Sequence, residues 1–273
     1  MNQSYHLYDY FFNKKIYMRT FIVLIVSILI ISCEQSVTEN TTTIEYPKNL
    51  QAVFEKHGGL TQWNKMNTLS YIVNKDGKTE SQIVDLKNRR ERIESEMFKT
   101  GFDGKNYWLE ADTTYKGNAI FYHNLMFYFY AMPFVLADEG INYEMVDTLE
   151  FDGQTNIGIR VTYDSNIGVS PEDEYILYYD SETNQMSWLA YTVTYFNTED
   201  EEKKAPKYGW IRYNDWKEFN GVVLPNSLTW YKTENNKPLE VRNTRTFTEV
   251  EITEAETVDS VFEKTENAEI VTE

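Results

Sequence analysis

Apolar and polar residues alternate along most of the chain from residue 68 onward, and a period of two is typical of β-strands with one buried face. Short Asp-Gly and Asn-Gly turn sequences separate several of the alternating runs. Because such turns join consecutive strands, we expect an antiparallel meander rather than the strand–helix alternation of a TIM barrel or Rossmann sheet. The pattern predicts eleven strands, over 68–74, 79–86, 89–97, 105–111, 143–149, 155–163, 174–179, 186–196, 208–217, 222–231 and 239–250.

Two segments interrupt the period of two and predict helices. Over 47–66, apolar residues recur at intervals of three and four, after Pro47 and around Gly58-Gly59, which predicts a helix followed by a short helical turn. Residues 118–137 hold seven aromatic side chains and little charge; we call them the aromatic insert. The insert has no polar face, so we expect one or two short, largely buried helices that break near Pro133.

The N-terminus has the pattern of a bacterial secretory signal. Residues 21–31 are apolar, basic residues precede them, and the run is too short for a bilayer, which needs about 20 apolar residues. The following Ile30-Ile31-Ser32-Cys33 resembles a lipobox, in which signal peptidase cuts before a lipidated cysteine. We therefore predict a signal peptide over 1–32 and lipid attachment at Cys33, with either Met1 or Met18 as the start of translation.

The rest of the chain divides into three parts by composition. Residues 33–45 are polar and lack periodicity, which predicts a flexible tether. The alternating segments place a single domain over 46–250. Residues 251–273 are acidic and lose the pattern, which predicts a loose tail.

Charge and residue content exclude several classes of function. The chain has 273 residues, with 26 Lys and Arg against 43 Asp and Glu, so a nucleic-acid partner is not expected. A single cysteine rules out an intramolecular disulfide and Cys-based metal sites. No HExxH spacing and no G-x-S-x-G sequence is present, so we expect no metal, no cofactor and no enzymatic activity. His57 and His123 are interpreted as packed side chains, and a hydrolase with an unfamiliar site is the least favoured alternative.

Four stretches resemble a known group of proteins. Residues 54–63, which contain His-Gly-Gly and Trp, and 102–108, which contain Phe-Asp-Gly and Trp, are similar to motifs of uncharacterised lipoproteins from Bacteroidetes-type bacteria. Residues 175–189 resemble the central hairpin of outer-membrane lipoprotein-sorting proteins, and 219–225 resemble their F-x-G-x-x-L-P strand entry. The resemblance covers about 48–250. It implies a LolA/LolB-like fold: a mainly β chain with helices (α+β), a single curved antiparallel half-barrel of about eleven strands with helices covering its concave face.

Such a fold suggests a lipid-anchored envelope protein that binds an acyl chain or lipid in its concavity. The alternative is a non-catalytic structural or interaction lipoprotein whose cavity is plugged by side chains. Glu34 is not part of a dense acidic run, which favours the periplasmic face of the outer membrane. The expected partners are the membrane, through Cys33, and the lipid. The candidate cavity residues are aromatic or methionine side chains: Trp63, Trp108, Phe121, Phe127, Phe129, Met132, Phe134 and Trp188.

Overall fold

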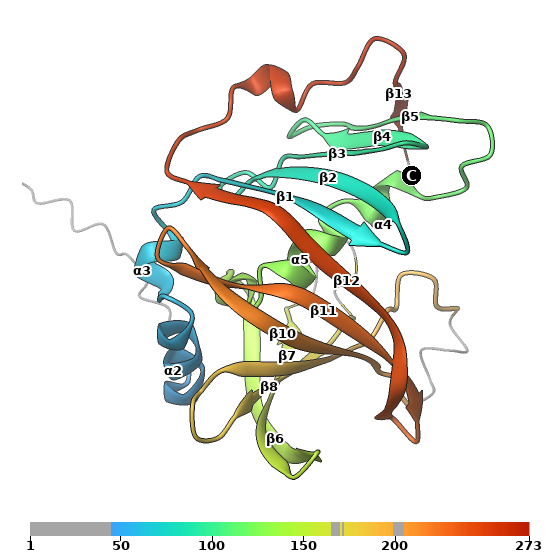
Figure 1. Ribbon diagram of the computed structural model, residues 1–273. Coiled ribbons are helices and arrows are strands. Elements are labelled where there is room, and N and C mark those ends of the chain that lie inside the picture. Colours follow the sequence, from blue (N-terminus) through green and yellow to red (C-terminus); the bar gives the residue numbers. More distant parts are fainter. Residues whose placement is uncertain (1–44, 165–169, 171, 199–204, 273) are drawn as a thin grey trace, which may run out of the picture. The chain divides into compact units, whose positions relative to one another are not determined.

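The computed structural model describes residues 45–164, 170, 172–198 and 205–272, and these fold around one antiparallel sheet (Figure 1). The predicted signal peptide, Cys33 and almost all of the predicted tether lie outside the described residues. None of the described helices is both long and apolar enough to cross a membrane. The strands are β1 (Thr68–Lys75), β2 (Lys78–Asp85), β3 (Glu91–Ser95), β4 (Phe98–Phe102), β5 (Tyr107–Ala111), β6 (Ile141–Phe151), β7 (Gln154–Tyr163), β8 (Tyr175–Asp180), β9 (Met186–Tyr191), β10 (Gly209–Phe219), β11 (Val222–Glu234), β12 (Lys237–Thr253) and β13 (Glu269–Val271).

The order of the strands shows two meanders joined at the centre of the sheet. From β1, the strands run outward in sequence to β5, and from β12 they run backward in sequence to β6. β1 and β12 pair antiparallel and unite the two halves. The sheet is open, with β13 and β6 at its edges. The predicted antiparallel, mainly β fold is confirmed, and all eleven predicted strands are present.

The alternation of apolar and polar residues did not identify two strands, β4 and β13. The predicted strand 89–97 ends at Ser95, and β4 follows after a turn in which the Ser95 Oγ accepts hydrogen bonds from the backbone N–H of Met97 and Phe98. β4 contains Gly101, where a Cβ would lie 2.5 Å from the indole of Trp108. A glycine in a short strand weakens the apolar alternation, although here it makes room for a large neighbour.

The hairpin turns follow the predicted chemistry. Asp76-Gly77, Asp152-Gly153 and Asn220-Gly221 all have positive φ at both residues, as a two-residue type I′ turn requires. A fourth turn of this kind, at Asn235-Asn236 between β11 and β12, also has positive φ at both positions. Asn tolerates the left-handed region better than most residues, which explains this turn without glycine.

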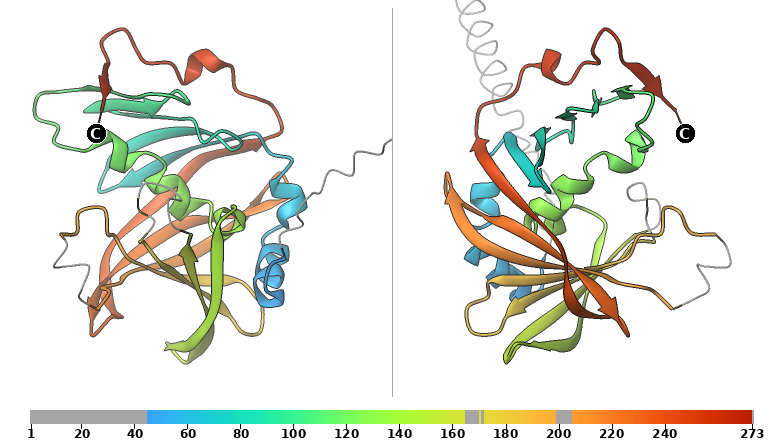
Figure 2. Two further views of the ribbon diagram at one scale, coloured as in Figure 1. Left: turned by 180° about the vertical axis from the view of Figure 1, so that it is seen from behind. Right: turned by 45° about the vertical axis from the view of Figure 1, so that its right-hand side comes forward.

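Helices cover one face of the sheet, which we call the inner face; the opposite face is the outer face. Figures 1 and 2 show the aromatic insert crossing the inner face, with the N-terminal helices beside the β10–β11 hairpin. The insert breaks at Asn124, which has positive φ, and at Pro133, so it forms short pieces as predicted. The helices are α2 (Lys48–Lys56), α3 (Leu60–Trp63), α4 (Ala119–Tyr122) and α5 (Leu125–Tyr130), with 3₁₀ turns η1 (Phe134–Ala137) and η2 (Asp259–Val261).

The main hydrophobic core lies between the inner face and these helices. It combines side chains of α2, α3, α5 and η1 with those of β1, β2 and β7 to β12. His57, at the end of α2, is buried in this region, where its Nδ1 lies 2.7 Å from the carbonyl oxygen of Val53. Its ring packs edge-on against Trp216 at 4.4 Å, so it is a packed side chain, as the sequence predicts.

The C-terminal segment differs from the loose tail that its acidic composition predicts. Beyond β12 it passes along the outer face and ends in β13, which pairs with β5 (Figures 1 and 2). Phe262 is fully buried, and its carbonyl oxygen accepts a hydrogen bond of 2.9 Å from the indole of Trp108. One buried aromatic residue among many acids gives no periodic signal, which explains why the sequence pattern fails here.

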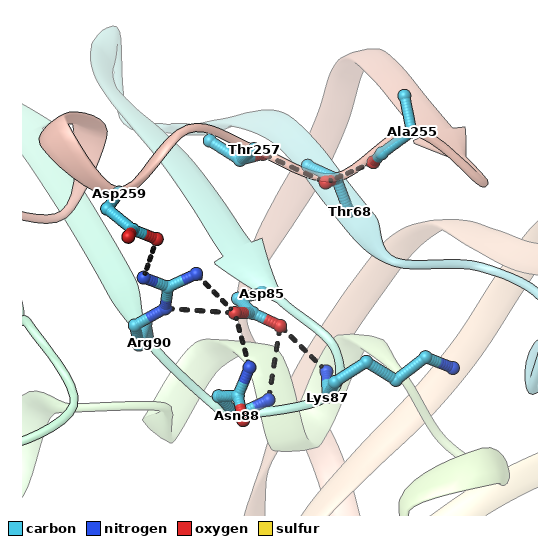
Figure 3. Close-up of polar contacts among 8 residues, drawn as sticks. All are labelled: Thr68, Asp85, Lys87, Asn88, Arg90, Ala255, Thr257 and Asp259. Atoms are coloured by element: carbon cyan, nitrogen blue, oxygen red, sulfur yellow. Dashed lines mark hydrogen bonds and ion pairs between the residues drawn. The ribbon is translucent and has the colours of Figure 1, made fainter.

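Polar contacts hold the start of this segment to the sheet (Figure 3). Arg90 bridges Asp85 at 2.8 Å and Asp259 at 2.7 Å. Although burial opposes the shift, hydrogen bonds from Asn88, Lys87 and Arg90 lower the pKa of the Asp85 carboxyl. The Thr68 hydroxyl reaches the carbonyl oxygen of Ala255 and the hydroxyl of Thr257, each at 2.8 Å.

Candidate functional site

Five of the eight predicted cavity residues lie in the main core. Phe127, Phe129 and Met132 come from the aromatic insert, and each is at most 6 % exposed. Phe134 is also buried and stacks on Trp63, with ring centroids 4.6 Å apart and planes 3° apart. The structure therefore brings five of the eight predicted residues into one region, where their side chains pack against one another and the sheet.

The other three predicted residues lie elsewhere. Phe121, on α4, packs against Tyr195 and the exposed Phe196, with centroid distances of 5.2 and 4.8 Å. Trp108 lies on the outer face beneath the C-terminal segment. Trp188 also faces outward, since its neighbour Leu189 belongs to the main core, and it joins a second cluster with Tyr178 and Trp210. The sequence marks these residues as large and apolar but does not give the face of the sheet on which they lie.

A cavity of about 510 Å³ lies at the other end of the insert, between α4, the β1–β2 hairpin and the β3–β4 turn. Its volume falls in the range of small-molecule sites, roughly 300–1,000 Å³. Val73, Phe98 and Met97 provide apolar surface, and Lys75, Asp76 and Lys78 are exposed where the hairpin turns. The lining residues are Val73, Lys75, Asp76, Lys78, Thr79, Glu80, Ser95, Glu96, Met97, Phe98, Tyr122 and Arg245.

A carboxylate and a tyrosine form one polar wall of this cavity. The Tyr122 hydroxyl lies 3.0 Å from each oxygen of Glu80, and the Gln82 amide also donates to Glu80. Gln82 in turn accepts a hydrogen bond of 2.6 Å from the hydroxyl of Tyr71. Burial is the main cause that raises the pKa of Glu80, against the hydrogen bonds from Gln82 and Tyr122. The wall therefore presents a hydrogen-bonded carboxyl group that is costly to ionise.

Arg245, on β12, supplies the opposite polar group. Its guanidinium lies over the Trp230 ring at 4.9 Å, and its Nη1 lies 3.6 Å from the Met126 sulfur. Among the described residues its Nε atom is buried and lacks a hydrogen-bond partner. A cation–π contact holds the group in place without using its N–H donors. Arg245 can therefore still donate hydrogen bonds.

A second polar cluster fastens the insert to the sheet at the junction of α4 and α5. Glu91, on β3, is 1 % exposed, and its Oε2 accepts a hydrogen bond of 2.7 Å from the backbone N–H of Asn124. The same oxygen lies 3.3 Å from Nδ1 of His123. Phe102 and Tyr107 pack against the imidazole, with centroid distances of 4.9 and 5.3 Å. His123 therefore has a packing and anchoring role, as the sequence predicts.

Glu80, Tyr122 and Arg245 are not among the site residues predicted from the sequence. A usable signal was nevertheless present, because Glu80 shares its strand face with buried Gln82 and Val84, and Arg245 shares its face with buried Phe247. Charged side chains on the buried face of a strand are uncommon and mark positions with a special role. In the part of the chain that the structure describes, no three His, Cys, Asp or Glu side chains are grouped so that they could hold a metal ion.

Comparisons with known proteins give similarity at the level of fold. No family model matches the chain, and no curated protein matches it either. A LolA superfamily protein from Nitrosomonas europaea has 8 % identity and a TM-score of 0.47, over 79 % of this chain and 97 % of that one. A DUF1329 family protein from Desulfovibrio piger has 8 % identity and a TM-score of 0.46, over 80 % of this chain and 98 % of that one.

A third structure comes from the group that the sequence resembles. It is a putative outer membrane lipoprotein-sorting protein domain from Vibrio parahaemolyticus, with 7 % identity and a TM-score of 0.40, over 74 % of this chain and 91 % of that one. The open antiparallel sheet with helices on one face is assigned from the structure of this chain itself. At these identities the similarity concerns fold alone.

Proposed function

We propose that this chain is a lipid-anchored, non-catalytic envelope protein that binds an acyl chain or lipid in the cavity beside α4. The observation that carries the proposal is the cavity itself, about 510 Å³ in volume, where Val73, Met97 and Phe98 provide apolar surface and most of the remaining lining is polar or charged. In small-molecule sites, apolar surface contributes the contact area and placed polar groups fix the orientation of the ligand.

Anchoring is the second part of the proposal, and its support comes from the sequence. Ile30-Ile31-Ser32-Cys33 resembles a lipobox, and the compact unit begins at Glu45, after a polar segment. A lipidated Cys33 would hold the protein at a membrane, since two or more acyl chains anchor stably. The periplasmic face of the outer membrane is the proposed location. Replacing Cys33 with Ser should release the protein from the membrane fraction.

The alternative function is a structural or interaction lipoprotein without a ligand. The filled region around Phe127 and Phe134 favours this alternative, because side chains there leave the core closed. The two proposals differ at the α4 cavity, which a ligand-free protein has no need to keep open.

An apolar fluorescent probe that lipid displaces would test binding. A chain that starts at residue 34 is suitable, because both core clusters are built from residues of the compact unit that begins at Glu45. Met97→Asp puts a charge on the apolar wall at a position that is 43 % exposed, so folding should be unaffected. We expect a several-fold loss of lipid affinity.

Met145→Asp is the matched control, because Met145 is 49 % exposed and does not line the cavity. Its lipid affinity should equal that of the unmodified chain. Equal affinity of both variants would place the lipid elsewhere, and no binding by any of the three proteins would favour the structural alternative.

A further inference from the structure

Three cationic side chains lie in neighbouring register positions across β12, β1 and β2. Lys75 and Lys78 are direct cross-strand partners. On the other side of β1, Asn74 pairs with Thr246, so Arg245 occupies the position next to Lys75. All three residues line the α4 cavity. The structure therefore gathers positive charge at one end of a cavity in a chain that carries 43 acidic and 26 basic residues.

The three cations repel one another across the strands, and acidic side chains line the same cavity. Like charges directly opposite each other on a sheet are destabilising. Among the ion pairs of the described chain, none involves Lys75, Lys78 or Arg245. Three acids, Asp76, Glu80 and Glu96, also line the cavity. The charges of Glu80 and Arg245 attract each other, but the oxygens of Glu80 are occupied by hydrogen bonds from Tyr122 and Gln82 and form no ion pair with the guanidinium, whose N–H donors stay available to a ligand.

The contacts of Arg245 make it the centre of this cationic row. Trp230 supports one face of the guanidinium, the Met126 sulfur lies beside Nη1, and Nε is buried without a hydrogen-bond partner in the described structure. A planar guanidinium presents its N–H donors in a fork that fits a carboxylate or phosphate. Because its position is fixed before binding, little rotamer entropy remains to be lost when an anion arrives.

We propose that the cavity binds a single-chain amphiphile whose anionic head is held by Arg245, with Lys75 and Lys78 beside it. The acyl chain lies against Val73, Phe98 and Met97. The head is a carboxylate or a phosphate, as in a fatty acid or an alkyl phosphate. The inference rests on the proposed lipid-binding function and adds the chemical class of the ligand.

Titration calorimetry with three ligands of equal chain length tests the proposal: decanoate, decyl phosphate and decan-1-ol. The protein is the chain that starts at residue 34. We expect either anion to bind about tenfold or more tightly than the alcohol, because hydrogen bonds to charged groups are stronger than neutral ones. The relative affinities of decanoate and decyl phosphate show whether the head is a carboxylate or a phosphate.

Three variants assign the preference to Arg245. Arg245→Gln should abolish the advantage of the anions and leave the affinity for decan-1-ol unchanged, and Arg245→Lys should keep part of it. Arg242→Gln is the control, because Arg242 lies on the same strand, is exposed and does not line the cavity. This variant should keep the full preference.

The remaining outcomes separate the two proposals. If the alcohol binds as tightly as the anions, the anionic head is overturned while lipid binding stands. If Arg245→Gln weakens alcohol and anions equally, the assigned role of Arg245 is wrong. If none of the three ligands binds, the proposed function fails together with this inference.

Discussion

The two parts of the inner face differ in what covers them. In the filled part, α5 places Phe129 against β9 and β11 and Tyr130 against β1 and β12, and Phe134 of η1 stacks on Trp63. Beside the β1–β2 hairpin and the β3–β4 turn, the cover is α4, only four residues long, and a cavity remains next to it. The filled part is apolar, whereas the hollow part contains Glu80 and Arg245.

The difference shows how one continuous insert serves two purposes. A helix that is apolar all round is buried on every side and closes the core. α4 instead carries Tyr122, whose hydroxyl binds Glu80 across the gap, so its contact with the sheet is partly polar. Apolar covering stabilises the fold, while polar covering leaves a shaped space at less cost than an empty apolar cavity of the same size.

Truncating the filled part should produce the largest effect. Phe127→Ala and Phe134→Ala should each cost about 3–5 kcal/mol in the free energy of unfolding, since both side chains are almost fully buried. Urea denaturation measures this cost. Phe196→Ala is the control, because Phe196 is 62 % exposed, and it should change stability by less than about 0.5 kcal/mol.

Lipid binding by the same two variants shows whether α5 and η1 form part of the ligand site. Their lipid binding should remain unchanged if the ligand occupies only the α4 cavity. A small loss of stability together with altered lipid binding would contradict the comparison and make α5 and η1 part of the ligand site.

Lowering the pH should reduce the free energy of unfolding through His57, which is buried beside the main core. Burial lowers the pKa of His57 from 6.5 to about 4, so the unfolded chain binds a proton that the folded chain excludes. The stabilising contribution of neutral His57 is therefore complete above pH 6.5. Below that pH the free energy of unfolding falls by about 1.4 kcal/mol per pH unit until the pH reaches about 4. Unfolding at pH 7 and pH 5 should show this slope, and His57→Gln should flatten it. An unchanged slope would mean that His57 is not its source.

Lowering the pH should have the opposite and smaller effect on stability through Glu80, in the hollow part. Burial raises the pKa of Glu80, so protonation of this carboxyl favours the folded state as the pH falls through the raised value. Glu80→Gln keeps an oxygen to accept the Tyr122 hydroxyl and removes the charge. We expect stability at pH 7 to rise by less than about 1 kcal/mol. A clear loss at pH 7 would show that the ionised carboxylate is needed, and Glu251→Gln, at an exposed position of β12, controls for the loss of one acid.

Much of the fold could be predicted because its signals are local. Alternation locates each long strand, and turns such as Asp76-Gly77 and Asn220-Gly221 specify where the chain reverses. Pro133 and the absence of a polar face describe the insert correctly. The pairing of β1 with β12 could not be predicted, because no local pattern identifies which distant strands meet.

The candidate site was harder to predict for the same reason. Trp63 and Phe134 look alike in sequence to Trp108 and Trp188, yet the first two stack in the core and the others lie on the outer face. Size and hydrophobicity predict that a residue is buried, but only the tertiary structure says against what. The cavity is instead defined by residues such as Arg245 and Glu80, whose importance comes from where the sheet places them.

The central pairing of β1 with β12 has a consequence for how the protein is made. The first long strand of the domain cannot find its partner until almost the whole domain has been synthesised, because β12 is the last long strand. Contacts between such distant segments form slowly, since loop-closure entropy is lost before they stabilise the chain. We therefore expect the β1–β12 pair, which joins the two meanders, to form after the local hairpins. If the predicted signal peptide directs export, we expect this late closure of the sheet to favour passage of the chain through a membrane pore before the fold is complete.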